Sequence, residues 1–315
     1  MSKLLFGIII PTYNYGHTLR RAVLSVVKQL DEDVELLVID DGSGDHTAEI
    51  IAQLKTECRG QIKFFYKPNG GLASTCNFGI AHANGDYLVF LDADDEMADG
   101  AINAMRSHLA SNPESKMLIG AHYSVYTNGK RKLHIPNTLP DTAHDRLKGY
   151  LLDKTISISN GACAKHKSVF QSISYPVKFR NSEDIPVFAY VLSNYYCTTL
   201  DFPLAFIHKH DDSLRHNATH AENVGIHLVD EVFHPSRIST ELQTLKKPFL
   251  AQRLLSLSRV CHENKRHLQC TQFYNQAIKS NWRVIFNWPY TKKFILSLLQ
   301  INPKIMLINN KNERI

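Results

Sequence analysis

The stretch from Tyr87 to Asp95 constrains this chain more than any other. Its first five residues, Tyr-Leu-Val-Phe-Leu, are apolar or aromatic and too few for a typical helix, so they predict a strand buried on both faces. Three carboxylates follow within four positions: Asp92, Asp94 and Asp95. Such a run repels itself unless a cation or hydrogen bonds absorb the charge. A solvated acidic turn is the ordinary explanation of an isolated Asp-x-Asp, so the rest of the chain has to decide between the two.

Alternating strands and helices are predicted for the first hundred residues. The predicted strands cover 4–10, 34–39, 62–66 and the stretch from 87, and the helices between them cover 17–30, 47–58 and 72–83. Pro11 should end the first strand because it lacks a ladder donor. This order predicts an α/β fold with a mostly parallel sheet flanked by helices. A helix over 97–109, strands over 117–126 and 131–135, and a helical C-terminal extension follow.

Polar residues stand at the carboxyl ends of three of these strands. Pro11-Thr12 follows the first, Asp40-Asp41 the second, and the acidic cluster the fourth. Ligands of open α/β sheets bind at those strand ends, so the residues should line one crevice. Asp92 and Asp94 could jointly hold a hard divalent ion there. For Asp41-Gly42-Ser43, turn formation and helix capping are a compatible alternative.

Several other protein classes lack support in the sequence. No G-x-G-x-x-G follows the first strand, which argues against a dinucleotide site, and no G-x-x-x-x-G-K-[ST] indicates a P-loop. Phosphatases of the haloacid-dehalogenase kind carry Asp-x-Asp after the first strand, whereas here it follows the fourth. No apolar run reaches the roughly 18 residues that span a bilayer. The six cysteines have neither metal-ligand nor redox-motif spacing, so we expect reduced thiols.

Positive charge is concentrated toward the C-terminus. From residue 241 onward the chain has 13 Lys and Arg against 3 Asp and Glu, while the preceding part has 23 against 27. A basic tail indicates an anionic partner surface, either phospholipid or nucleic acid. Residues 282–299 mix aromatic, aliphatic and basic side chains and include both tryptophans. They suit an interfacial membrane helix, or equally a helix packed on the protein with its basic face in solvent.

Four motifs in register resemble family 2 of the glycosyltransferases. They are Ile-Ile-Ile-Pro-Thr-Tyr-Asn at 8–14, Val-Ile-Asp-Asp-Gly-Ser at 38–43, Asn-Gly-Gly-Leu at 69–72 with Asn-Phe-Gly-Ile at 77–80, and the stretch 85–95. The resemblance implies an inverting enzyme with the GT-A (Rossmann-like) fold. It also implies a nucleotide-sugar donor, usually UDP-linked, and an Mg²⁺ or Mn²⁺ ion.

The same resemblance assigns roles to the residues of these motifs. Thr12, Asp40 and Asp41 would form the nucleoside pocket, Asp92 would contact the ribose or the metal, and Asp94 would bind the metal. We count the neighbouring Pro11, Tyr13, Asn14, Gly71, Asn77 and Ala93 as further donor contacts. The family often has an arginine where this chain has Cys76, so another cation must replace it, and Lys67 is the candidate.

In family 2, the catalytic base usually comes from a Glu-Asp pair that follows the Asp-x-Asp motif at about the separation found in this chain. Here the pair is Glu183-Asp184, at the start of an apolar helix. Ser182 is a suitable N-cap, and acidic residues in a first helical turn are expected from the dipole alone. A sugar hydroxyl is nevertheless a poor nucleophile and needs a carboxylate to take its proton. Asp184 is therefore the predicted base, with Glu183 as the second choice.

Two later segments are candidates for the acceptor side and the metal. In the segment 157–164, the backbone at Asn160-Gly161-Ala162 could lie close to the acceptor sugar, and an ordinary strand with a bulge is an equal alternative. In the polar segment 208–215, His210 could complete the metal shell or bind the diphosphate, and Arg215 could also bind the diphosphate. A surface loop is the alternative explanation of that segment.

Together these observations predict a glycosyltransferase domain over residues 1–220, with a nucleotide-sugar half over about 1–112 and an acceptor half over about 113–220, and a basic helical region over 221–315. The expected reaction moves a hexose or N-acetylhexosamine to a hydroxyl of a glycan or lipid-linked acceptor in cell-surface polysaccharide or lipopolysaccharide synthesis. A non-catalytic relative that binds nucleotide or membrane is the alternative. Residues 1–10 do not read as a signal peptide, so we expect a cytoplasmic protein, peripheral at the inner membrane face, without a nucleic-acid partner.

Overall fold

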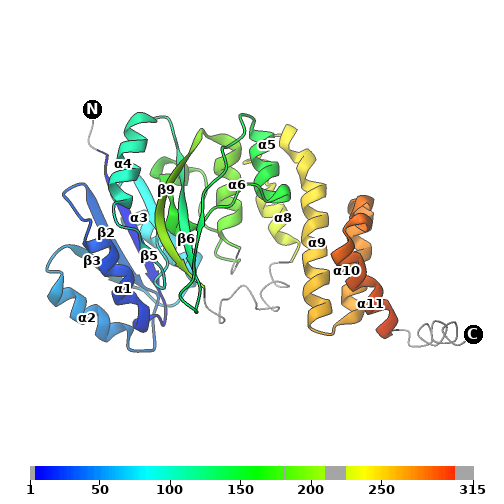
Figure 1. The fold of residues 1–315 in the computed structure, drawn as a ribbon, viewed down its shortest axis with the longest axis horizontal. Coiled ribbons are helices and arrows are strands. Elements are labelled where there is room, and N and C mark those ends of the chain that lie inside the picture. Colours follow the sequence, from blue (N-terminus) through cyan, green and yellow to red (C-terminus); the bar gives the residue numbers. More distant parts are fainter. Residues whose placement is uncertain (1–3, 180–181, 210–224, 302–315) are drawn as a thin grey trace, which may run out of the picture. The chain divides into compact units, whose positions relative to one another are not determined.

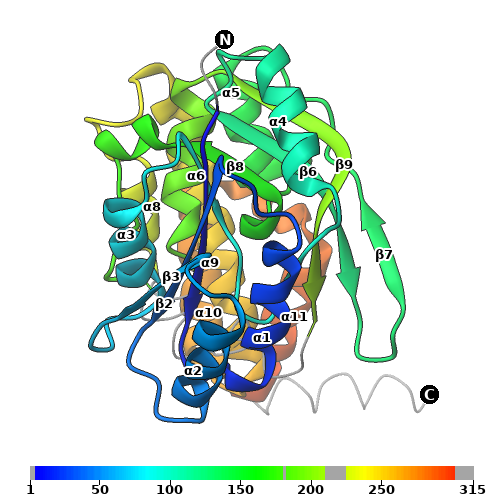
Figure 2. The same ribbon diagram turned by 90° about the vertical axis from the view of Figure 1, so that its left-hand side faces the viewer.

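The computed structural model describes residues 4–179, 182–209 and 225–301 (Figure 1). The chain divides into two compact units, residues 1–213 and 214–315. The first unit is a single curved sheet covered by helices on both faces (Figure 2). This arrangement confirms the predicted α/β class.

The first half of this unit alternates strands and helices as predicted. Its elements are β1 (Phe6–Thr12), α1 (Gly16–Val27), β2 (Val34–Asp40), α2 (Thr47–Glu57), β3 (Ile62–Tyr66), α3 (Leu72–His82) and β4 (Tyr87–Phe90). The second half contains β5 (Glu96–Met97), α4 (Ala101–Ser111), β6 (Met117–Val125), β7 (Arg131–His134), α5 (Ala143–Lys148), the short turn η2 (Asn160–Ala162), β8 (Cys163–His166), α6 (Asp184–Asn194) and β9 (Cys197–His208).

The strand order places the ends of β1 and β4 side by side. The order is β3-β2-β1-β4-β8-β6-β9-β5, with β7 paired to β6. Strands β1 to β4 are parallel, whereas β8 runs antiparallel between β4 and β6. The strand order reverses at β1, which lies between β2 and β4. In α/β sheets the ligand crevice opens at such a switch point, at the carboxyl ends of the strands.

Successive side chains along the strands point to opposite faces of the sheet and pack in two separate hydrophobic cores. Ile8 and Ile10 of β1 face the helices α1, α2 and α4, whereas Ile9 faces α3 and α6. Val89 and Phe90 of β4 divide in the same way. Because both faces are covered, the strands are apolar at nearly every position, which is why the sequence predicted them well.

Two predicted element ends are wrong, for local reasons. Strand β1 continues through Pro11 to Thr12, in register with Asp40 of β2. The nitrogen of Pro11 faces the side of β1 on which β4 has already ended. The missing N–H therefore removes no hydrogen bond between strands. Residues 97–100 do not join the predicted helix, because Glu96–Met97 form β5 against β9 and Gly100 has a φ of +79° before α4 begins.

Two further predictions about the second half are also wrong. The ordinary strand offered as an alternative for 157–164 does not form, since residues 160–162 form the turn η2 and only Cys163–His166 form a strand. Ser182 is not the N-cap of the helix that follows. Glu183 occupies that position, and its own carboxylate accepts a hydrogen bond from the Ser182 N–H at 2.9 Å.

The second unit is helical, which confirms the predicted C-terminal extension. It contains α8 (His227–Val232), α9 (Lys246–Glu263), α10 (His267–Ser280) and α11 (Trp288–Ile301), with short turns at Glu241–Leu245 and Trp282–Phe286. The Tyr274 ring stacks on Phe294 at 4.3 Å between centroids, which packs α10 against α11. Among the described helices, none combines the length and apolar character that crossing a bilayer requires.

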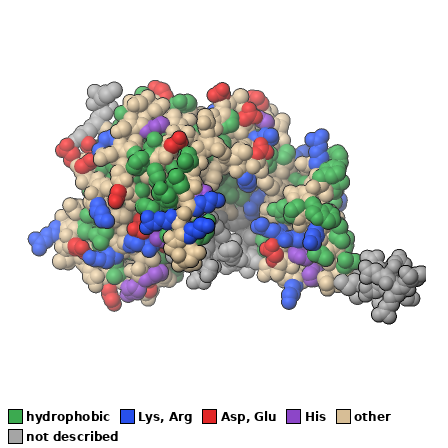
Figure 3. All heavy atoms as spheres, viewed as in Figure 1, with side chains coloured by type: hydrophobic (Ala, Val, Ile, Leu, Met, Phe, Trp, Pro, Cys, Tyr) green, Lys and Arg blue, Asp and Glu red, His purple; other side chains and the backbone are tan. Residues whose placement is uncertain are grey.

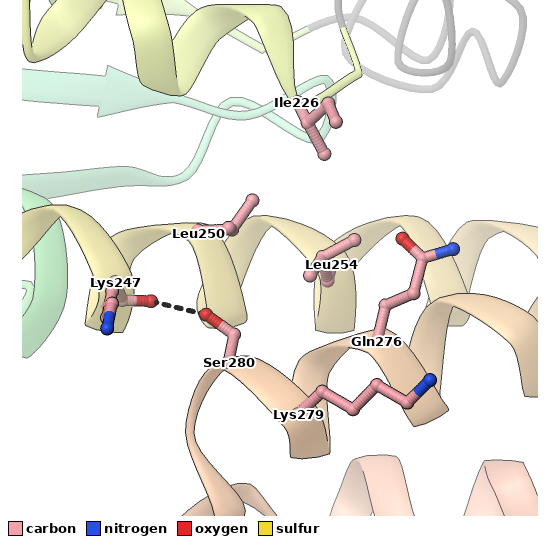
Figure 4. A pocket seen from close by; sticks show the side chains of 7 residues that line it. All are labelled: Ile226, Lys247, Leu250, Leu254, Gln276, Lys279 and Ser280. Atoms are coloured by element: carbon pink, nitrogen blue, oxygen red, sulfur yellow. Dashed lines mark hydrogen bonds between the residues drawn. The ribbon is translucent and has the colours of Figure 1, made fainter.

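A hollow of about 360 Å³ lies along α9 and α10 of this unit (Figure 4). Ile226, Leu250 and Leu254 give it apolar walls. Its polar rim consists of Lys247, Gln276, Lys279 and Ser280. The Ser280 hydroxyl donates to the Lys247 carbonyl at 3.0 Å, which ties the end of α10 to the start of α9.

Candidate functional site

The three carboxylates that follow β4 lie together. One oxygen from each of Asp92, Asp94 and Asp95 lies within 4.8 Å of the others. Asp95 is buried, whereas Asp92 and Asp94 are partly exposed. Carboxylate oxygens are the ligands that Mg²⁺ and Mn²⁺ prefer. The donor set therefore fits a hard divalent ion, and Asp95 adds a carboxylate that was not among the predicted metal ligands.

Contacts from two other elements, α1 and β9, hold this acidic loop in place. Arg21 of α1 donates to the Asp94 carbonyl at 2.5 Å, and its Nε lies 3.4 Å from Glu96 Oε1. Asp95 Oδ1 accepts from the backbone N–H of His208 at 2.8 Å, and the His208 ring bonds Glu96 Oε1 at 2.8 Å. The loop is thus fixed through its backbone and through Asp95.

Like charges crowd one another in this cluster. Burial raises the pKa of Asp95 well above its usual range, and the charges of Asp92 and Asp94 raise it further. Burial and the same carboxylates raise the pKa of the nearby Tyr15 hydroxyl to about 12. Tyr15 therefore keeps its proton at neutral pH and can donate a hydrogen bond. It was not predicted as a site residue, although its place in the loop after the first strand was a signal for it.

Asp41, at the end of β2, organises the neighbouring loop. One of its oxygens accepts from the Lys67 ammonium and from the Gly70 N–H at 3.0 Å, and the other accepts from the Gly71 N–H at 2.8 Å. Gly71 has a φ of +83°, a conformation that favours glycine, and precedes the first residue of α3. Both oxygens of Asp41 are thus engaged within the chain, and the Lys67 ammonium is committed to this carboxylate.

Asp40 and Thr12, at the ends of β2 and β1, carry less completely satisfied polar groups. Both side chains are buried. Asp40 Oδ1 accepts from the Ser43 N–H at 2.9 Å, its one hydrogen bond within the described part of the chain. The Thr12 hydroxyl is buried and has no partner there. An orphaned buried hydroxyl costs free energy unless a ligand or water satisfies it.

The other predicted donor contacts of the β1 end lie close by. Pro11 is buried on β1, and Ala93 is buried between Asp92 and Asp94, whereas Tyr13 is exposed. Asn14 adopts a φ of +59° and joins two loops, since its side chain accepts from the Gly44 N–H at 2.8 Å. The loops after β1 and β2 are therefore bonded directly to each other.

Asn77 links α3 to the backbone of Tyr175, 98 residues further along the chain, through two hydrogen bonds. Its amide donates to the Tyr175 carbonyl at 2.8 Å and accepts from the Tyr175 N–H at 2.9 Å. The neighbouring Cys76, at the position where the family often has arginine, is fully buried on the same helix. All six cysteines of the chain are buried free thiols.

The predicted base lies at the first residue of α6. Asp184 opens the helix and is partly exposed, whereas Glu183 before it is 6% exposed. The charges of Asp92, Glu183 and Asp184 all raise the pKa of the buried Cys76 thiol, so the acidic loop and the start of α6 both lie near that thiol. His210 and Arg215, predicted for the metal and the diphosphate, lie outside the described residues.

Comparison with known sequences settles the family. The sequence model of the family described as glycosyl transferase family 2 matches residues 7–173, which is more than half of the chain and includes every strand end described above except that of β9. The chain belongs to glycosyl transferase family 2.

Curated relatives match part of this family-2 chain. An uncharacterised glycosyltransferase of Haemophilus influenzae is 36% identical over 113 residues, covering 36% of this chain and 45% of the relative. One from Nostoc is 41% identical over 89 residues, or 28% of each chain. The chondroitin synthase of Pasteurella multocida is 37% identical over 98 residues, 31% of this chain and 10% of the synthase. Each match spans less than half of the relative.

Solved structures extend the similarity to nearly the whole chain. Residues 1–349 of TarS from S. aureus, in complex with UDP-GlcNAc, superpose with a TM-score of 0.68 at 19% identity. The match covers 93% of this chain and 89% of that one. At this identity the similarity shows the fold, which is the GT-A fold.

Removing one charge from the acidic cluster should stabilise the metal-free protein. At neutral pH the Asp94→Asn substitution removes one of the charges that repel ionised Asp95, so the free energy of unfolding should rise. Mn²⁺ at about 100 times its Kd should stabilise the wild type by about 2.7 kcal/mol, and the variant by much less. Thermal unfolding of both proteins with and without Mn²⁺ measures the two effects.

Asp99→Asn provides a matched control, because it makes the same change at an exposed residue outside the cluster. This variant should respond to Mn²⁺ as the wild type does. Equal stabilisation by Mn²⁺ in wild type and Asp94→Asn would contradict a metal site at these carboxylates.

Proposed function

We propose that the chain is an inverting, metal-dependent hexosyl- or N-acetylhexosaminyl-transferase that uses a nucleotide sugar, UDP-linked in the first instance. Its acceptor would be a hydroxyl of a glycan or lipid-linked saccharide in cell-surface polysaccharide or lipopolysaccharide synthesis. The observation that carries the proposal is the acidic cluster of Asp92, Asp94 and Asp95, with oxygens within 4.8 Å of one another at a strand switch point. Family membership and the UDP-GlcNAc complex of the TarS structure support the choice of donor.

Thr12 and Asp40 are the best candidates for contacts to the nucleoside. The buried hydroxyl of Thr12 lacks a partner in the described part of the chain, and Asp40 uses one oxygen on Ser43. A second carboxylate oxygen can accept the imide N–H of uracil or a ribose hydroxyl. Asp41 would act indirectly, since both its oxygens hold the 67–71 loop. Lys67 therefore fits poorly as a replacement for the arginine that the family has at the Cys76 position.

Asp92 and Asp94 would hold the divalent ion beside the donor diphosphate. When bound, such an ion neutralises charge that develops on the departing phosphate. Arg21 and His208 would keep the loop from moving as that charge changes, through their bonds to the Asp94 carbonyl and the Asp95 carboxylate. Tyr15 would offer a neutral hydroxyl at the same edge.

Asp184 would take the proton from the attacking acceptor hydroxyl. It is the more accessible member of the acidic pair, while the Glu183 side chain is buried and occupied by the Ser182 N–H. A single displacement, with the hydroxyl opposite the leaving diphosphate, inverts the anomeric centre. A positioned carboxylate of this kind contributes about 10²–10⁴-fold to the rate.

A screen of nucleotide sugars for Mn²⁺-dependent release of nucleoside diphosphate tests the proposed function, and Asp184→Asn tests the base. The variant keeps the size of the side chain and removes its basicity. With the active donor its kcat should fall by about 10² or more while donor binding is retained. Glu183→Gln, the neighbouring change, should cost less because adjacent helix positions face different directions. Near-normal turnover by Asp184→Asn would remove Asp184 from the reaction.

The C-terminal unit is the proposed contact with a membrane. The aromatic cluster Trp282, Phe286 and Trp288 is 59%, 74% and 63% exposed. Arg283 and Lys292 lie exposed in the same segment. Figure 3 shows hydrophobic and basic side chains intermixed on one face of this unit. Exposed aromatic rings with flanking basic groups suit the interface of an anionic bilayer, where each Lys or Arg near the surface adds about 1 kcal/mol.

Serine substitutions in the aromatic cluster should weaken lipid binding without unfolding the protein. Trp282, Phe286 and Trp288 are largely exposed, so their loss removes little packing. Co-sedimentation with liposomes containing anionic lipid should fall in the Phe286→Ser/Trp288→Ser variant, and high salt should weaken wild-type binding. Leu268→Ser is the control, because Leu268 is 59% exposed on α10 outside the cluster. Unchanged binding in the double variant would contradict the membrane proposal.

A further inference from the structure

Lys165 of β8 is fully buried, with 0% of its surface exposed. In register it lies opposite Leu88 of β4 and Met117 of β6, so apolar strands flank it on both sides. Its ammonium donates to Asn160 Oδ1 at 3.3 Å and lies 4.0 Å from Cys163 Sγ. Within the described residues it forms no ion pair with a carboxylate. A buried charge without such a partner normally costs a protein stability.

Two aromatic rings take the place of the missing counter-charge. The Lys165 nitrogen lies 5.1 Å from the centre of the Phe90 ring and 4.7 Å from that of Phe188. Both distances fall within the range of cation–π attraction, which strengthens when the cation is desolvated. The ammonium is thus held between a strand and a helix by ring faces and one amide oxygen.

The three groups around this ammonium belong to three segments of the candidate site. Phe90 ends β4, two residues before Asp92. Phe188 lies on α6, one helical turn after Asp184. Asn160 belongs to η2, which contacts β4, β6 and β9. One buried side chain therefore joins the strand of the acidic cluster, the helix of the predicted base and the turn predicted near the acceptor.

The charge of Lys165 acts on the same buried thiol, Cys76, as the charges of the site carboxylates. Burial raises the pKa of the Cys76 thiol, and Asp92 and Glu183 raise it further, whereas Lys165 lowers it. Lys165 thus acts on the thiol that stands where the family often has arginine. The ammonium of Lys67, in contrast, is bonded to Asp41.

We propose that Lys165 is a positioning residue of the transfer reaction, whose buried ammonium fixes α6 and η2 against β4. The proposal rests on the proposed function and adds a residue that its motifs do not include. A cation in the core without a carboxylate partner lowers the stability of the fold, so we attribute its presence to a role in the site. Removing the charge should therefore lower activity without lowering stability.

Lys165→Met separates these two effects, because methionine nearly matches the shape of the lysine stem and carries no charge. With the active donor and Mn²⁺, kcat should fall about 10-fold or more, since small misplacements of reacting groups have effects of this size. The KM for the donor should stay within about twofold, because the donor contacts are untouched. The melting temperature should equal or exceed that of the wild type.

A second variant cancels the charge without altering β8. Asn160→Asp places a carboxylate at the oxygen that already bonds the Lys165 ammonium. It should also lower kcat and preserve or raise the melting temperature. Lys167→Met is the matched control on the same segment, since the Lys167 ammonium bonds the Ala83 carbonyl away from the acidic groups. That control should lose some thermal stability and keep its kcat.

Wild-type kcat in both Lys165→Met and Asn160→Asp would overturn the positioning role. So would a parallel loss of kcat and melting temperature in Lys165→Met, which is the signature of a purely structural lysine. A wild-type protein that releases diphosphate from no nucleotide sugar would overturn the proposed function, and the positioning role with it. An active wild type whose Lys165 variants match it overturns the positioning role alone.

Discussion

Mutual repulsion among the carboxylates after β4 is the constraint that the rest of the site depends on. A strand buried on both faces delivers Asp92, Asp94 and Asp95 to one edge, where their oxygens lie within 4.8 Å of one another. Burial and the neighbouring charges both disfavour ionised Asp95. The fold tolerates this because Arg21 and His208 hold the loop through hydrogen bonds. A divalent cation bound here would neutralise the remaining negative charge of the carboxylates and could itself bind phosphate oxygens.

Hydrogen bonds between loops keep the remaining groups in place around this edge. Asn14 bonds the loop after β1 to the loop after β2, Asp41 gathers residues 67–71, and Asn77 clasps the backbone of Tyr175. These contacts engage backbone N–H and C=O groups of the loops. Loops held in this way are organised before any ligand arrives, which lowers the free-energy cost of binding. The motif residues thus stabilise the loops themselves, in addition to the donor contacts proposed for them.

The sequence predicted the parallel half of the sheet well, because strands covered on both faces leave a continuous apolar signal. The predictions from sequence were wrong where the local structure depends on a segment that is distant along the chain. Pro11 remains in β1 because β4 ends before reaching it, and Glu96–Met97 pair with a strand about 110 residues away along the chain rather than starting a helix. The bonds of Asn77 and the ring partners of Lys165 also join distant segments, so no local pattern contains them. The motifs identified the Asp-x-Asp carboxylates, but not how fully Asp41 and Lys67 are used within the chain.

Calorimetric titration of UDP tests the central claim, that the acidic cluster holds a metal ion which in turn binds the donor diphosphate. Wild type and Asp94→Asn are each titrated with and without Mn²⁺. Tight binding is expected only for the wild type with Mn²⁺, because the phosphate contact needs both the ion and its carboxylate ligands. Equal affinity in all four titrations would contradict it.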